Sequence, residues 1–211
     1  MKIVFSLLVA CVVFFSIGCD EDVVTGSVFD DHAGVTYDDG SGLTDILDGK
    51  NFYFGNLHSH SDYSDGDGTP AEGFVWARDI AGYDFYAVTD HAESLDSDEF
   101  NDTGVQASNY TVDHVFLAFR GFEWSHPTLG HMNVWKTSNY TSALSKLYMS
   151  DFYEWVDDRD GFAQFNHPGR EDGLFNDFGY NKDVTDNVIF IETGNKGTGN
   201  VNGEYLAYYT R

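Results

Sequence analysis

The sequence contains few cysteines and few basic residues, and each shortage argues against a class of protein. The 211 residues include 2 cysteines, Cys11 and Cys19, and both lie near the N-terminus. The body of the chain therefore cannot carry a disulfide framework or a thiolate-bound structural zinc site. Lys and Arg number 11 against 35 Asp and Glu, which gives a formal net charge of -24 at pH 7. Such a charge repels phosphate backbones and argues against a nucleic-acid partner.

The chain does contain enough apolar and aromatic material for a folded domain. Hydrophobic residues make up 42% of the sequence and include 18 Phe, 13 Tyr and 4 Trp, which excludes intrinsic disorder despite the charge. The length fits one domain with short extensions. The sequence has no visible internal repeat. Its glycine-rich segment 194–203 lacks the Gly-Lys-Ser/Thr of a phosphate-binding loop.

Residues 1–19 have the features of an export signal. Lys2 precedes an apolar run that is shorter than a transmembrane helix requires. The run ends at Gly18-Cys19 and resembles a bacterial lipobox, with Ser16 where that pattern prefers Leu. We therefore expect a lipoprotein signal peptide over 1–19, a lipid anchor on Cys19 that attaches the protein to a membrane, and a location in the cell envelope. The alternatives are a plain signal peptide cut nearby, or a buried strand.

After an acidic segment over 20–50, which we expect to be a solvated linker, the chain alternates strand and helix patterns. Thr69, Pro70 and Glu72 combine a capping box with a proline in the first turn and predict a helix between two strands, which favours a parallel sheet. The acidic, Asn-rich and Ser-rich stretch 92–112 is expected to be a surface loop. The expected elements are strands over 51–57, 84–89, 114–124, 131–135, 162–165 and 188–191, and helices over 70–81 and 143–158. The strand over 131–135 is expected to fold back on the one before it.

Histidines and carboxylates follow the ends of these expected strands, where parallel α/β barrels build their active sites. One such histidine would be unremarkable, because most isolated histidines are surface or core residues. The series is longer than that: His58, His60, Asp65, His91, Glu123, His131 and His167. Imidazoles and carboxylates together suit Zn, Mn or Fe. Asp65 has an alternative interpretation, since the stretch 62–67 also fits an Asx-rich turn.

The order of these motifs resembles that of PHP (polymerase and histidinol phosphatase) domains. The resemblance runs from about residue 54 to residue 192, and its 123–131 segment is most similar to the branch that includes carbaryl hydrolase. It is carried by these motifs: His58-Ser59-His60, Ser64-Asp65-Gly66, Thr89-Asp90-His91, Gly121-Phe122-Glu123, Gly130-His131 and Asn166-His167-Pro168-Gly169.

The resemblance implies an α/β fold, a distorted (β/α)7 barrel, and a site with two or three divalent ions (Zn, Mn or Fe). The residues that match its metal ligands are His58, His60, Asp65, His91, Glu123, His131 and His167. The family's late Asp-x-His motif has no match, and about five of seven barrel strands are visible. We therefore expect residues 51–211 to be a metallohydrolase domain that lacks its C-terminal part.

The implied activity is hydrolysis by a metal-bridged hydroxide, most simply of phosphoesters in a small anionic substrate. Asp90 is expected to orient a ligand histidine, while His126 or Arg170 meets the developing charge. Arg170 could instead pair with Glu171 or Asp172. Carbamate or carboxylester hydrolysis is the chemical alternative. A non-catalytic metal-binding lipoprotein at the cell surface, and a structural or adhesive lipoprotein, are the alternatives from other classes.

Overall fold

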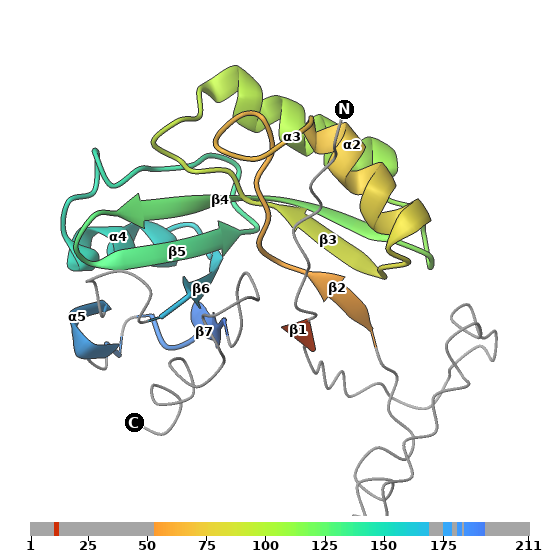
Figure 1. The fold of residues 1–211 in the computed structure, drawn as a ribbon. Coiled ribbons are helices and arrows are strands. Elements are labelled where there is room, and N and C mark those ends of the chain that lie inside the picture. The colour runs from red at the N-terminus through yellow and green to blue at the C-terminus, as the bar shows by residue number, and fades with distance from the viewer. Residues whose placement is uncertain (1–10, 13–52, 169–174, 179–180, 183, 193–211) are drawn as a thin grey trace, which may run out of the picture.

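The computed structural model describes residues 11–12, 53–168, 175–178, 181–182 and 184–192 (Figure 1). The expected linker over 20–50, Cys19, Arg170 and the segment 193–211 lie outside the described residues, so the predictions made for them stay predictions. No described helix is long and apolar enough to cross a bilayer.

The described strands form a single mixed sheet in the order β1-β2-β3-β4-β5-β6-β7. Strands β2, β3 and β4 are parallel, β4, β5 and β6 are antiparallel in turn, and β7 is parallel to β6. The strands are β1 (Cys11–Val12), β2 (Phe54–Asn56), β3 (Phe85–Val88), β4 (Leu117–His126), β5 (Gly130–Trp135), β6 (Phe162–Asn166) and β7 (Val188–Ile191). Strands β2 to β7 curl into a half-barrel (Figure 1), which agrees with the expected incomplete distorted barrel.

The two-residue strand β1 pairs antiparallel with β2 and lies within the segment predicted to be a signal peptide. Strand β5 folds back on β4 as the sequence predicts, and it continues the sheet as a full member between β4 and β6.

The first helix forms where the sequence predicts it. Helix α2 (Pro70–Val75) begins at a capping box in which Thr69 and Glu72 bond each other's backbone N–H groups. It continues as a π-helical segment, η2 (Trp76–Ile80), and Phe74 and Ala77 are fully buried. Gly82, at a φ of 67°, follows the helix in a conformation that glycine adopts without strain.

The prediction of a surface loop over 92–112 is wrong, because most of this segment forms helix α3 (Ser97–Tyr110). The Asp96 carboxylate accepts bonds from the backbone N–H groups of Asp98 and Glu99, and the Glu99 side chain bonds back to Asp96 N. Phe100 and Ala107 are buried on the face that packs against the sheet. A strong cap and a sparse apolar stripe therefore outweigh a composition that is typical of loops.

Helix α4 (Met149–Asp157) is shorter than the expected 143–158. Leu144 and Leu147, which were expected on its apolar face, precede the helix and are 75% and 56% exposed. Phe152 and Trp155 are buried in it as expected.

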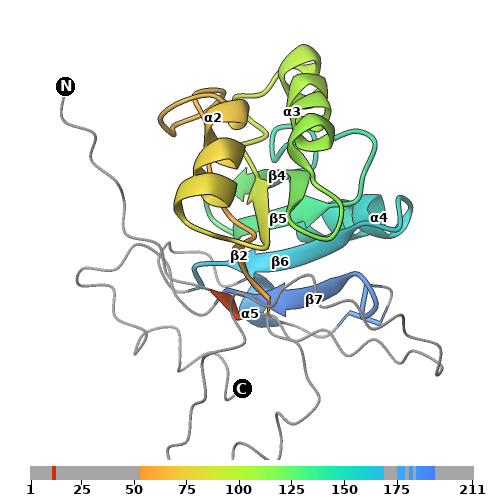
Figure 2. The same cartoon turned by 90° about the vertical axis from the view of Figure 1, so that its right-hand side faces the viewer.

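Helices α2 and α3 lie side by side over one face of the sheet (Figures 1 and 2). Phe122 and Trp124 of β4 point to this helix-covered face, where Phe122 contacts Phe100 of α3 and Trp155 of α4. Because side chains alternate along a strand, Glu123 and Ser125 point to the inner side of the curl. The helix-covered face of the sheet thus carries the large apolar core, and Glu123 lies on the opposite face of β4.

Candidate metal centre

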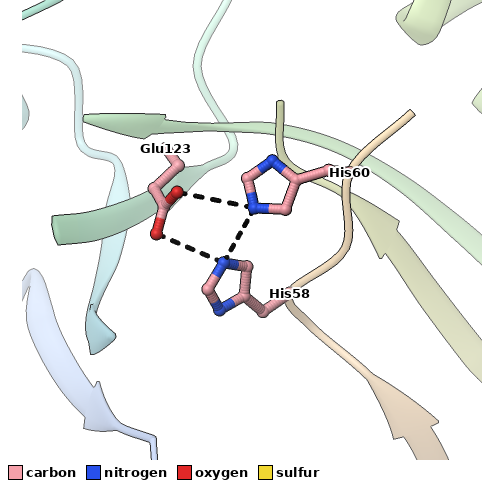
Figure 3. Close-up of side chains that lie close together, drawn as sticks. All are labelled: His58, His60 and Glu123. Atoms are coloured by element: carbon pink, nitrogen blue, oxygen red, sulfur yellow. Dashed lines mark hydrogen bonds and ion pairs between the residues drawn. The ribbon is translucent and has the colours of Figure 1, made fainter. Parts of the chain in front are cut away.

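The segment after β2 presents two histidines to the inner side of the sheet. The Asn56 side chain accepts from His58 N and donates to His58 O, which fixes the turn at the end of the strand. Ser59 faces the other way and donates its hydroxyl to Ala87 O on β3. His58 and His60 therefore lie together, with their Nε2 atoms 3.2 Å apart (Figure 3).

Glu123 lies at the middle of the cluster and is fully buried on β4. Its Oε1 lies 3.2 Å from His58 Nε2, and its Oε2 lies 3.5 Å from His60 Nε2 (Figure 3). Three more imidazoles complete a ring around it: His91 Nδ1 at 2.9 Å from Oε2, and His131 Nδ1 and His167 Nε2 at 3.5 and 3.4 Å from Oε1. One carboxylate thus faces five histidines from four segments of the chain.

Asp65 joins the cluster from a surface turn. Its Oδ1 lies 3.4 Å from His60 Nδ1 and 3.6 Å from His91 Nε2, and its side chain is 62% exposed. A Cβ on the next residue, Gly66, would lie 2.1 Å from the His60 carbonyl oxygen, so only glycine lets the turn approach this closely. His60, Asp65 and His91 form one of three groups whose ligand atoms could hold an ion.

Asp90 acts on the cluster through another side chain. It is buried, and its carboxylate accepts bonds from the N–H and hydroxyl of Ser61 and from the Ser64 hydroxyl. Ser64 Oγ in turn lies 3.2 Å from His60 Nδ1. Asp90 therefore reaches His60 indirectly, by holding Ser64 beside the ring.

His126 is placed apart from the other predicted site residues. It lies one position beyond Ser125 on β4, so it points away from the face that carries Glu123, and its ring stacks on Trp124 at 5.3 Å. Its Nδ1 accepts bonds from the N–H groups of Thr128 and Leu129 in the turn to β5. The structure therefore places His126 at the end of β4, beside the turn to β5, and does not bring it together with the other predicted site residues.

Four polar residues that sequence reasoning left out of the site support Glu123 and His91. Asn166 donates to Glu123 Oε1 at 2.7 Å and to Asn133 Oδ1 at 2.9 Å. Gln164 donates to Asn166 Oδ1 at 3.0 Å, and Ser125 Oγ lies 2.5 Å from His91 Nδ1. Asn166 directly precedes His167, and position in the motif is the signal that could have identified it.

Glu192 is not among the residues that match the family's metal ligands, but it also lies at the site. It follows β7, and its carboxylate lies 3.2 Å from His58 Nδ1 and accepts a bond of 2.6 Å from His167 N. The position at a strand end is the same signal that identified the histidines.

The charges in the cluster depend on one another. Burial lowers the pKa of His58, but the carboxylates of Glu192 and Glu123 outweigh it and raise that pKa to about 10. Burial and the neighbouring charge of His58 lower the pKa of His60 to about 3. Burial alone would raise the pKa of Glu123. The charge of His58, together with side-chain hydrogen bonds to the Glu123 carboxylate, nevertheless holds that pKa well below its usual range. The carboxylates of Glu123 and Glu192 therefore favour a positive charge on the His58 ring between them.

The donor set fits divalent ions. Three overlapping groups each bring imidazole nitrogens and carboxylate oxygens within 4.8 Å of one another. Buried His131 Nδ1 makes no hydrogen bond in the described part of the chain and points to the same carboxylate. A buried polar atom in this position calls for a partner, which an ion would provide.

A separate cavity of about 670 Å³ lies between the start of α3 and the 138–145 segment. Glu93 lines it, and the same carboxylate accepts bonds from Ala143 N and Ser125 N. None of the histidines of the cluster lines this cavity. The cavity and the cluster are therefore distinct features, and the bond from Ser125 N to Glu93 lies between them.

Comparisons with known proteins include a likeness to a solved structure. No family model and no curated protein matches the sequence. A solved structure from Bacteroides vulgatus, described as a two-domain protein containing a predicted PHP-like metal-dependent phosphoesterase, superposes with a TM-score of 0.43 and 25% sequence identity. The overlap covers 55% of this chain and 35% of that one, so the chain spans about a third of that structure.

Proposed function

We propose that this chain is a metal-dependent hydrolase of the PHP type, with two or three divalent ions (Zn, Mn or Fe) at the cluster, and that it cleaves phosphoesters. The observation that carries the proposal is the buried Glu123 carboxylate, whose two oxygens face five imidazoles. No other described residue combines that burial with so many ligand-type neighbours.

The two oxygens of Glu123 divide the candidate ligands into two sets. Oε1 faces His58, His131 and His167, and Oε2 faces His60 and His91, which also contact Asp65. Bound divalent ions supply hydroxide from water near neutral pH and polarise the bond under attack. The chain's own contribution is to hold the ligands in this order, with Asn166 on Oε1 and Ser125 beside His91.

The test combines metal binding with turnover. The metal-stripped chain is titrated with Zn²⁺, Mn²⁺ and Fe²⁺, and each loaded form is assayed with chromogenic phosphomonoesters, phosphodiesters, carboxylesters and carbamates. We expect at least two equivalents of metal and hydrolysis of a phosphoester. Glu123→Gln should lose both, whereas Glu154→Gln, which removes an exposed carboxylate from α4, should keep both.

The other outcomes separate the alternatives. If only carboxylesters or carbamates are hydrolysed, the chain is a carboxylester or carbamate hydrolase, of which the carbaryl-hydrolase type is one kind, and not a phosphoesterase. Metal binding without turnover would indicate a non-catalytic metal-binding lipoprotein. A wild-type chain that binds no divalent ion would refute the proposal.

We also propose that Cys19 is acylated and attaches the protein to a membrane of the cell envelope. The sequence Gly18-Cys19 after the apolar run supports it. Mass spectrometry of the exported protein should show an acyl-sized increase on Cys19, and Cys19→Ala should release the protein or block its maturation. An unacylated soluble wild-type product would contradict this.

A further inference from the structure

Glu192 contacts two of the candidate ligand histidines, His58 and His167. Its Oε1 lies 3.2 Å from His58 Nδ1, and its Oε2 accepts a bond of 2.6 Å from the backbone N–H of His167. It is 8% exposed, so these contacts are made away from bulk water. Each oxygen of one buried carboxylate thus reaches a different histidine.

The two nitrogens of the His58 ring face different carboxylates. Nε2 lies 3.2 Å from Glu123 Oε1 and 3.2 Å from His60 Nε2, where ligand atoms gather. Nδ1 is turned the other way, as Figure 3 shows, and meets Glu192. An imidazole can bind a metal through the lone pair of one ring nitrogen while the other nitrogen carries a proton and donates it in a hydrogen bond. The acceptor of that hydrogen bond decides which nitrogen is protonated and which is free to bind the metal.

Glu192 also binds the backbone of His167, which has an unusual conformation. His167 has a φ of 28°, in the region that residues with a Cβ rarely occupy. Its ring nevertheless stacks on the His58 ring, with centroids 5.7 Å apart, and its Nε2 lies 3.4 Å from Glu123 Oε1. The bond from His167 N to Glu192 offsets the cost of that conformation and holds the ring in place.

We propose that Glu192 is a positioning residue of the centre, which fixes the His58 ring with Nδ1 protonated and Nε2 turned to the metal, and which holds the His167 backbone. It is not itself a ligand, because the His58 ring stands between its carboxylate and Glu123. The inference rests on the proposed function, since it concerns how this chain presents ligands to the same ions. It gives the end of β7 a role in a site that is otherwise built on β2 to β6.

The test measures Zn²⁺ binding and the state of the His58 ring, and needs no substrate. The full chain carries Glu192→Gln, Glu192→Ala or the control Glu154→Gln, which removes an exposed carboxylate of the same charge. Zn²⁺ affinity is measured by competition with a chromophoric chelator. The protonated nitrogen of His58 is identified from ¹⁵N shifts, assigned with a His58→Gln chain.

We expect Glu192→Ala to bind one Zn²⁺ equivalent about 10–100-fold more weakly, the range typical of lost partners of metal-ligating histidines. Its His58 shifts should change, because the proton on Nδ1 is no longer held. Glu192→Gln should lose less affinity, since its amide oxygen still accepts one bond. Glu154→Gln should match the wild type in both measurements. If the alanine chain fails to fold by circular dichroism, the glutamine chain carries the test.

Two results would overturn the inference alone. In the first, both Glu192 variants bind Zn²⁺ as tightly as a wild type that does bind it, with unchanged His58 shifts. In the second, Glu192→Gln saturates one full equivalent lower, which makes Glu192 a ligand. A wild-type chain that binds no Zn²⁺ would refute the proposed function as well, so the two failures are distinguishable.

Discussion

Glu123 is the residue on which the geometry of the candidate site depends, and Asn166 is its closest hydrogen-bonding partner. Asn166 Nδ2 donates to Glu123 Oε1 at 2.7 Å and to Asn133 Oδ1 at 2.9 Å, and all three side chains are fully buried. Asn133 donates onward to Leu57 O, directly before His58. The network therefore connects the carboxylate to the backbone that carries the first histidine.

Replacing Asn166 with alanine should weaken both the metal site and the fold. We expect metal affinity to fall about 10–100-fold, because Glu123 loses the donor that orients it. The free energy of unfolding should fall by about 1–3 kcal/mol, because buried polar partners are left unsatisfied. Chelator competition measures the first effect, and urea denaturation of the metal-free chain measures the second.

The matched control is Asn101→Ala, an exposed asparagine on α3. It should leave metal affinity unchanged and should not lower stability, since alanine is the better helix former. Wild-type affinity in Asn166→Ala would mean that Glu123 needs no such support.

At the scale of elements, helix α3 depends on its first turn. The Asp96 carboxylate accepts from two backbone N–H groups at 2.8 and 2.9 Å. The helix has few apolar residues with which to compensate, since its buried positions are Phe100, Thr103 and Ala107. We therefore expect the cap to supply a large share of the free energy that stabilises this segment as a helix.

Asp96→Ala should therefore lower the free energy of unfolding by about 1 kcal/mol, the usual cost of losing an N-cap. Urea denaturation of the metal-free chain provides the measurement. Ser108→Ala, at an exposed position near the other end of the helix, should change stability by less than about 0.5 kcal/mol. Equal effects of the two substitutions would show that the cap is not what stabilises α3.

At the scale of the whole molecule, the stability of the metal-free chain should depend on pH in a way that the cluster dictates. His60, with its pKa lowered to about 3, makes stability rise as pH increases from 3 to 6.5, because the unfolded chain then binds the extra proton. His58 acts in the opposite sense. Its raised pKa gives stability that is present below 6.5 and is lost as pH rises towards 10.

We therefore expect the metal-free chain to be most stable near pH 6.5 and to lose stability on the alkaline side. Chemical denaturation in the presence of a chelator, at intervals from pH 5 to 10, measures this profile. His58→Gln should remove much of the alkaline loss. A wild-type stability that stays flat or rises between pH 7 and 10 would contradict the charge arrangement of the cluster.

The parts that could be predicted from the sequence are those in which the signal is local. The capping box at Thr69 and Glu72 gives helix α2, and the apolar runs give every strand from β2 to β7 within a few residues. Helix α3 was missed because its signal lies in one capping carboxylate and in contacts with β4, which composition does not reveal. The register of β4 likewise decides that Glu123 points inwards and His126 outwards.

The sequence by itself determined the types of ligand and their order along the chain, because motif spacing and strand ends are properties of neighbouring residues. Only the tertiary structure decided which of them meet, since residues as distant as His58 and Glu192 approach through the curl of the sheet. It also placed Asn166 against Glu123, Glu192 against His58 and His167, and His126 at the end of β4 away from the cluster. The physical reason is that a buried charge selects its partners by packing and desolvation across several strands, and this information is not contained in any single segment.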